Sequence, residues 1–197
     1  MGKKKPYTLW GENLDPQAIA QMENAMELMG RYAAASHEII HASIFRALGE
    51  SPIVTIENHH NFAWKEKIGL RNFIIHRKGA IPASRGKMGI IPGSMADPSF
   101  VIKGLGNEDA INSAAHGAGR AMSRNAAMKL FTFKDLQDIL QKKQITLISA
   151  GLDEIPMAYK NIHHVMFQQK DLVETMAIFE PRLVKMALPG KRKKRFK

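Results

Sequence analysis

A helical pattern that continues from residue 16 to residue 48 is the feature that most constrains the fold of this chain. Asp15 is a typical N-cap ahead of a proline in the first turn. Apolar side chains then recur at helical spacing, among them Ile19, Met22, Met26, Met29, Ile39, Ile40 and Ile44. Apart from Gly30, the sequence has no stop signal before Gly49. Because so long a helix is unusual in a small domain, we expect a seam or a bend between residues 28 and 31.

The rest of the sequence mixes short strands with helices. Strands are predicted at residues 53–56, 73–76, 99–103, 145–149 and 182–186. Helices are predicted at residues 119–130, 134–142, 158–165 and 172–178, and Thr132 with Asp135 forms a capping-box pattern before the second of these. The elements lack regular βαβ spacing, so the sequence predicts an α+β fold with a mixed sheet and packed helices.

Positive charge is concentrated at the two ends of the chain. The formal net charge is +11, and nine basic residues belong to Lys3–Lys5 and to the run from Lys191 to Lys197. The remainder is nearly balanced, with 20 basic against 18 acidic residues. Such tails contact a polyanion or simply remain solvated, and the sequence leaves both alternatives open.

Composition also limits the class of protein. The chain has no cysteine, which excludes disulfides and thiolate metal ligands. No apolar run follows the basic start, and no segment approaches the length of a transmembrane span. With 197 residues, 45% of them hydrophobic, the chain can bury a real core. We therefore expect a globular, cytoplasmic protein with no membrane partner.

The residues after His116 are typical of a phosphate site. The small residues from Gly117 to Gly119 let a ligand approach the backbone. If a helix starts near Gly117, Arg120 and Arg124 lie four and eight residues beyond His116 on one face. An imidazole, two guanidinium groups and a helix N-terminus would then converge. This combination suits a phosphate, or a nucleotide attached to the imidazole through phosphorus.

Two other clusters are weaker candidates. His59 and His60 precede Asn61, and imidazole at such a place is a candidate ligand for Mn²⁺ or Zn²⁺, although a hydrogen-bonded surface histidine is the commoner outcome. The run from His76 to Ala80 can hold phosphates or form a solvated turn. The sequence has no Walker A motif, no GxGxxG after a strand, and few carboxylates near these clusters. The chemistry that these residues still allow is attack by a histidine nucleophile, with arginines stabilising a phosphoryl transition state.

Five blocks then occur in a fixed order along the chain. They are residues 59–63 (HHNFA), 76–80 (HRKGA), 91–95 (IPGSM), 113–120 (SAAHGAGR) and 152–160 (LDEIPMAYK). Together they resemble the RtcB family of RNA ligases, the tRNA-splicing and RNA-repair enzymes. The resemblance extends over residues 53–187 and corresponds to the C-terminal part of the family's fold.

The resemblance implies an enzyme that joins an RNA 3′-phosphate or 2′,3′-cyclic phosphate to a 5′-hydroxyl, using GTP and Mn²⁺. It implies that His116 accepts GMP from GTP and that His60 binds the metal. Nucleotide contacts are implied for Asn61, Ser94, Ser99, Gly117, Ala118, Gly119, Arg120 and Tyr159. Contacts with phosphates or RNA are expected from Arg77, Lys78, Arg120 and Arg124.

The chain also departs from the family pattern. Residues 14–28 and 32–38 resemble two family segments that a long stretch normally separates, and here they are adjacent. In the family this stretch holds an aspartate, a cysteine and a histidine that bind metal. The family's C-terminal lysine has no clear match in this chain, although Lys185 lies nearby. We therefore divide the chain into a basic tail (1–13), a helical segment (14–52), an RtcB-like catalytic region (53–187) and a second basic tail (188–197).

One imidazole does not suffice for Mn²⁺, which prefers several ligands, mostly oxygen. We therefore expect the ligase activity of this chain alone to be absent or weak, unless a second chain completes the metal site. The first alternative is a non-catalytic RNA-binding remnant. The second is a metal-dependent phosphoesterase that does not need GTP.

Overall fold

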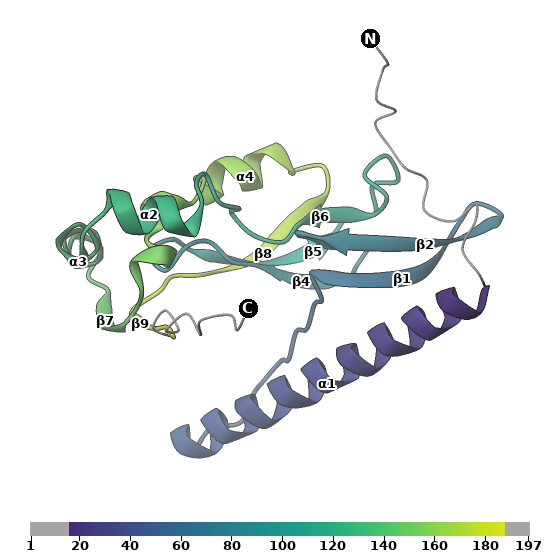
Figure 1. Cartoon of the computed structure of the whole chain (residues 1–197), viewed down its shortest axis with the longest axis horizontal. Coiled ribbons are helices and arrows are strands. Elements are labelled where there is room, and N and C mark those ends of the chain that lie inside the picture. Colours follow the sequence, from purple (N-terminus) through teal and green to yellow (C-terminus); the bar gives the residue numbers. More distant parts are fainter. Residues whose placement is uncertain (1–15, 188–197) are drawn as a thin grey trace, which may run out of the picture. The chain divides into compact units, whose positions relative to one another are not determined.

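The computed structural model describes residues 16–187, so both basic tails and Asp15 lie outside the described residues. These residues form two compact units (Figure 1). One unit contains the described residues up to Thr55 together with Phe62–His76. The other contains Ile56–Asn61 and the described residues from Arg77 onward. All the candidate site residues, from His60 to Tyr159, belong to this second unit.

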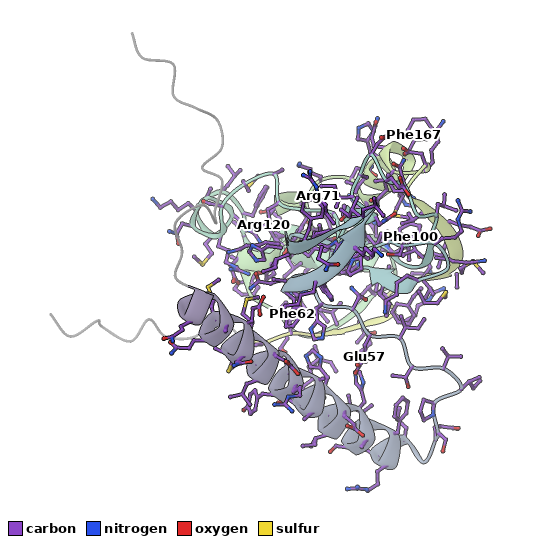
Figure 2. All side chains as sticks on the ribbon, turned by 90° about the vertical axis from the view of Figure 1, so that its right-hand side faces the viewer. Glu57, Phe62, Arg71, Phe100, Arg120 and Phe167 are labelled. Carbon is purple, nitrogen blue, oxygen red and sulfur yellow. The ribbon has the colours of Figure 1, made fainter. Side chains whose placement is uncertain are left out.

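Helix α1 (Pro16–Leu48) is continuous, so the bend expected between residues 28 and 31 is not formed. A glycine inside a helix costs only about 1 kcal/mol, which is too little to break a long one. The helix ends before Gly49, whose φ of +71° is left-handed. Most of its side chains project into solvent (Figure 2). Even so, the described residues include no helix with the length and hydrophobicity that crossing a bilayer requires.

Strands β1 (Asn61–Ile68) and β2 (Arg71–Lys78) form a hairpin, most of which belongs to the same unit as α1. The ring of Phe62 lies against α1 at Gly30. A Cβ added to this glycine would be 2.8 Å from the ring carbon Cε2 of Phe62. The glycine in the middle of α1 is therefore explained by the close approach of an aromatic ring.

The second unit is built on an antiparallel sheet of three strands in the order β4-β5-β8 (Figure 1). Its strands are β4 (Met88–Ile91), β5 (Ser99–Gly104) and β8 (Val173–Phe179). Two further pairs are antiparallel β3 (Ala80–Pro82) with β6 (Ser113–Ala115), and parallel β7 (Thr146–Ser149) with β9 (Leu183–Lys185). The mixed α+β architecture predicted from the sequence is confirmed.

Three short helices complete this unit, each with a polar N-cap. They are α2 (Arg124–Leu130), α3 (Phe133–Lys142) and α4 (Ile162–Gln168), capped by Ser123, Thr132 and Asn161. The predicted capping box of α3 is confirmed, since Thr132 and Asp135 bond each other's backbone N–H groups. The Thr132 hydroxyl and then its backbone N–H, both donating to Asp135, lower the pKa of that carboxyl. Single 3-10 turns, η1 (Leu152–Glu154) and η2 (Pro156–Ala158), precede α4.

Two apolar clusters form the core of the second unit. The first contains Ile81, Ala83, Ile91, Phe100, Ile102, Ala114, Ala118, Ile162 and Val173. The second contains Ala96, Ala127, Leu136, Leu140, Ile145, Ala150, Ile155, Ala158 and Val184. Tyr159 packs against both clusters, so the segment that follows η2 is held between them.

Some predicted elements are wrong. Residues 53–56 form no strand, since no described strand pairs with them. Residues 172–178 were expected to be helical, but most of them belong to β8, because pairing from Val173 opposite Gly104 to Phe179 opposite Ser99 overrides a short helical pattern. The helix expected at residues 158–165 begins only at Ile162, after the cap formed by Asn161.

Gln169 is a buried polar residue at the C-terminal end of α4, with 4% of its surface exposed. Its carboxamide oxygen accepts a hydrogen bond from the backbone N–H of Ala115 at 2.9 Å. Its carboxamide nitrogen contacts the sulfur of Met166, a weak acceptor. Ala115 is the last residue of β6, so Gln169 fixes the strand that leads directly into His116.

Gly30→Ala is expected to lower the free energy of unfolding, because the added methyl group collides with the Phe62 ring. In a Phe62→Ala background the same change is expected to raise stability by up to about 1 kcal/mol, since alanine is the better helix former. Urea unfolding of the four proteins measures both effects. Stabilisation by Gly30→Ala in both backgrounds would contradict the proposed contact.

Gln169→Leu is expected to cost about 1–3 kcal/mol, because it leaves the Ala115 N–H buried without an acceptor. Gln168→Leu makes the same chemical change at the neighbouring, exposed position and serves as the matched control, with an expected effect within about 0.5 kcal/mol. Urea unfolding compares the two variants. Equal effects of both changes would show that the buried hydrogen bond contributes nothing.

Candidate functional site

His116 follows strand β6 and lies half-buried beside a glycine turn. Its backbone N–H donates to the carbonyl of Gly79 at 3.3 Å. Gly79 has a φ of +75°, and a Cβ added to it would be 3.7 Å from the His116 ring. Pairing of β3 with β6 therefore brings the turn after Lys78 next to the imidazole, and the glycine keeps that side open.

The imidazole of His60 stacks on that of His116. Their ring centroids are 5.2 Å apart and the ring planes differ by 21°. The carbonyl of His60 accepts a hydrogen bond from the Gly79 N–H at 3.0 Å, which fixes the backbone of this residue. Partial desolvation of this still exposed ring, together with the imidazoles of His116 and His59, lowers the pKa of His60. The neutral form, with a free nitrogen lone pair, is thus favoured near neutral pH.

Asn58 holds the segment that carries these residues. Its side-chain oxygen accepts from the Ile90 N–H at 3.0 Å, and its side-chain nitrogen donates to the Ile90 carbonyl at 3.4 Å. These two hydrogen bonds tie the segment to the edge strand β4. They place His59, His60 and the exposed Asn61 beside the core sheet. Sequence reasoning missed Asn58, although an asparagine directly before a histidine pair is a usable signal.

The residues after His116 do not form the helix start that the sequence suggested. Gly119 has a φ of +71°, which an α-helix does not allow, and α2 begins only at Arg124 after the Ser123 cap. Residues 117–123 instead follow an irregular path, and the Ala118 N–H donates to the Pro92 carbonyl at 3.2 Å. A Cβ on Gly117 would be 3.0 Å from that same carbonyl oxygen. The expected alignment of His116, Arg120 and Arg124 on one helix is therefore wrong.

Arg120 is bonded to the segment from Asp153 to Tyr159. Its guanidinium donates to the Asp153 carbonyl at 2.7 Å, to Glu154 at 3.3 Å and to the Tyr159 hydroxyl at 3.2 Å, and it lies 5.0 Å from the centre of the Tyr159 ring. Its Nε also donates to the carbonyl of Met122. Nucleotide and phosphate contacts by Arg120 and Tyr159 remain predictions, but the two residues are held together.

Arg124, the first residue of α2, extends into solvent with 65% of its side chain exposed. It contacts Glu154 at 2.7 Å and Asp153 at 3.7 Å, and the hydrogen bond and charge of Glu154 raise its pKa. Sequence reasoning missed Glu154, which bonds Arg120, Arg124 and Tyr159. Its place in the 152–160 block was the available signal.

The two serines expected to contact the nucleotide lie in the loop after β4 and at the start of β5. The Ser94 hydroxyl donates to Asp97 at 2.5 Å, and Ser99 begins β5. Lys143 donates to the Asp97 carboxylate at 2.9 Å and to the Ala96 carbonyl at 2.7 Å. Burial alone would raise the pKa of Asp97, but the Ser94 hydroxyl and the Lys143 ammonium lower it overall. Lys143 thus fixes this loop from α3.

Arg77 and Lys78 have different surroundings. Arg77 is only 2% exposed, and it donates to the Ser113 hydroxyl at 2.7 Å and the Ile111 carbonyl at 3.0 Å. Lys78 is exposed. Arg77 therefore has a structural function in holding residues 111–113, and its expected contact with phosphate remains a prediction, as does that of Lys78.

The described residues do not fit an Mn²⁺ site. Within residues 16–187, no three side chains of the histidine, aspartate and glutamate type gather around a common point. The pair of His60 and His116 offers imidazole nitrogens, whereas Mn²⁺ prefers several oxygen ligands. A metal ion at this place would need ligands from outside the described residues.

Comparison of the sequence with known proteins identifies its relatives. The sequence model of the tRNA-splicing ligase RtcB family matches residues 9–186. The RNA-splicing ligase RtcB of Escherichia coli (strain K12) is 46% identical over 121 residues, which cover 61% of this chain and 30% of that protein. The tRNA-splicing ligase RtcB of Methanococcus maripaludis is 36% identical over 173 residues, covering 72% of this chain and 36% of that protein.

The share of each relative that is covered is small: the chain spans about a third of the length of these two proteins. The family match itself extends over most of the chain and includes all five sequence blocks. The chain therefore belongs to the RtcB family of tRNA-splicing ligases.

Proposed function

We propose that this chain takes part in RNA ligation of the RtcB type, with His116 as the nucleophile that accepts GMP from GTP. The substrates would be RNA ends that carry a 3′-phosphate or 2′,3′-cyclic phosphate and a 5′-hydroxyl. The observation that carries the proposal is the half-buried His116 imidazole, stacked on His60 and with a glycine, Gly79, rather than a larger residue beside it.

The chemistry proceeds by transfer of one nucleotidyl group. An imidazole nitrogen of His116 attacks the α-phosphorus of GTP, so that a P–N bond forms and pyrophosphate leaves. A 2′,3′-cyclic end is first opened by water, which breaks the bond from phosphorus to the 2′-oxygen and leaves a 3′-phosphate. An oxygen of the RNA 3′-phosphate then attacks the guanylyl phosphorus, which breaks the P–N bond and activates the RNA end. The 5′-hydroxyl oxygen finally attacks the 3′-phosphate, forms the phosphodiester and releases GMP. Family membership supports this sequence of steps.

Two features of the chain support a need for a second component. The described residues do not fit Mn²⁺, the metal that RtcB enzymes generally use with GTP. The chain also spans only about a third of the relatives it matches. We therefore propose that the metal ligands come from another polypeptide segment and that guanylylation by this chain alone is slow.

RNA binding without ligation is the second candidate. The exposed cations Lys78 and Arg124 support it, and so do the nine basic residues of the tails, which lie outside the described residues. This binding would be electrostatic and would weaken steeply with salt. It would not depend on the His116 imidazole.

Incubation with GTP labelled at the α-phosphate and with excess Mn²⁺ is expected to place a slow, covalent GMP label on this chain. His116→Ala is expected to abolish the label, because no other nucleophile replaces the imidazole. Mass spectrometry of the labelled peptide locates the adduct. Absence of any label, combined with salt-dependent RNA binding that is unchanged in His116→Ala, would favour the RNA-binding remnant instead.

The stability of the fold is expected to decrease on mild acidification because of His60. Its folded pKa lies below the ordinary value of 6.5, so the unfolded chain takes up the proton more readily as the pH falls below 6.5. His60→Asn removes this loss, and its unfolding free energy should fall less between pH 7.5 and pH 5.5. Urea unfolding at the two values gives the comparison; identical losses in both proteins would contradict it.

A further inference from the structure

One carboxylate, that of Glu154, is shared by three side chains of the candidate site. It accepts from Arg120 at 3.3 Å, from Arg124 at 2.7 Å and from the Tyr159 hydroxyl. We propose, on the basis of the function proposed above, that Glu154 is both a positioning and a specificity-determining residue. It fixes Arg120 and Tyr159, and it holds Arg124 in an exchangeable ion pair that only a terminal phosphate of the RNA replaces.

Arg120 is the fixed member of the arginine pair. Only 23% of its side chain is exposed, and its donors also bond the carbonyls of Met122 and Asp153. The backbone around it is bonded as well, from Ala121 N–H to the Ala158 carbonyl and from Lys160 N–H to the Gly119 carbonyl. A movement of this guanidinium would break several hydrogen bonds together, so Arg120 orients Tyr159 rather than exchanging partners.

Arg124 is the exchangeable member. Its side chain is 65% exposed, and the contacts described for it are with the carboxylates of Glu154 and Asp153. An ion pair so exposed contributes about 0–1 kcal/mol, because water and salt screen it. The guanidinium can therefore leave Glu154 for a better anion without disturbing the core.

Glu154 occupies the position that an anion would take between the two arginines, and an incoming phosphate must compete with it. A terminal phosphate monoester carries about −1.5 to −2 charges at neutral pH, whereas an internal phosphodiester carries about −1. The terminal phosphate therefore replaces the Glu154 carboxylate, of charge −1, as the partner of Arg124, whereas the internal phosphodiester does not. The competition would direct Arg124 to RNA ends and away from the continuous backbone.

The test compares binding of one short oligoribonucleotide with a 3′-phosphate and with a 3′-hydroxyl, without GTP or metal. The unmodified chain is expected to prefer the 3′-phosphate. Glu154→Gln is expected to raise affinity for the 3′-hydroxyl form more than for the 3′-phosphate form, so that the preference falls by about twofold to fivefold. Asp138→Asn removes the same charge at an exposed position of α3, away from these side chains, and should leave the preference unchanged.

A second variant keeps the test independent of the folding of Glu154→Gln. Arg124→Gln alters an exposed side chain and is expected to abolish the preference, and Glu154→Gln should then have no further effect on it. The Nε–H resonance of Arg124, but not that of Arg120, should shift when the 3′-phosphorylated oligomer is added. An unchanged preference in Glu154→Gln, or one retained in Arg124→Gln, overturns the proposal. Guanylylation of His116 is measured separately, so either proposal can fail without the other.

Discussion

Gly79 makes one backbone hydrogen bond to each histidine of the candidate site. Its N–H donates to the carbonyl of His60 and its carbonyl accepts from the N–H of His116. The two histidines are 56 residues apart in number, so local structure does not bring them together, whereas these two bonds do. The positive φ of Gly79 makes the turn feasible, and the missing side chain leaves space beside the imidazole. Pairing of β3 with β6 and the buried side chain of Gln169 then support this arrangement from the other side.

Local signals in the sequence were sufficient for several elements. The capping box at Thr132 and strand β5 lie where short-range patterns place them, because each depends on neighbours within a few residues. The segment that became β8 shows the limit. Its apolar residues have helical spacing, but its partner is β5, some seventy residues earlier, and single-sequence periodicity contains no information on that pairing.

For the candidate site, the sequence indicated which residues to consider but not which contacts they make with one another. The sequence identified His116 and, through family resemblance, the His60 block, and the structure stacks the two rings. It did not reveal that Arg120 and Arg124 converge on a carboxylate about thirty residues later, nor that Arg77 is buried. Each of these contacts is long-range. In the sequence alone, an arginine suggests a binding site for an anion. Its contacts in the structure can show instead that it stabilises the fold.

Strand β5 lies in the middle of its sheet, and the ribosome synthesises its two neighbouring strands at different times. β4 precedes it along the chain, whereas β8 follows after three helices and several other elements. During synthesis, one edge of β5 therefore stays open until nearly the whole described chain has left the ribosome. Such a delay exposes an unpaired strand edge to other nascent chains. Gln169, which bonds the last residue of the strand before His116, also lies in this late part of the chain, so the candidate site is completed late in folding.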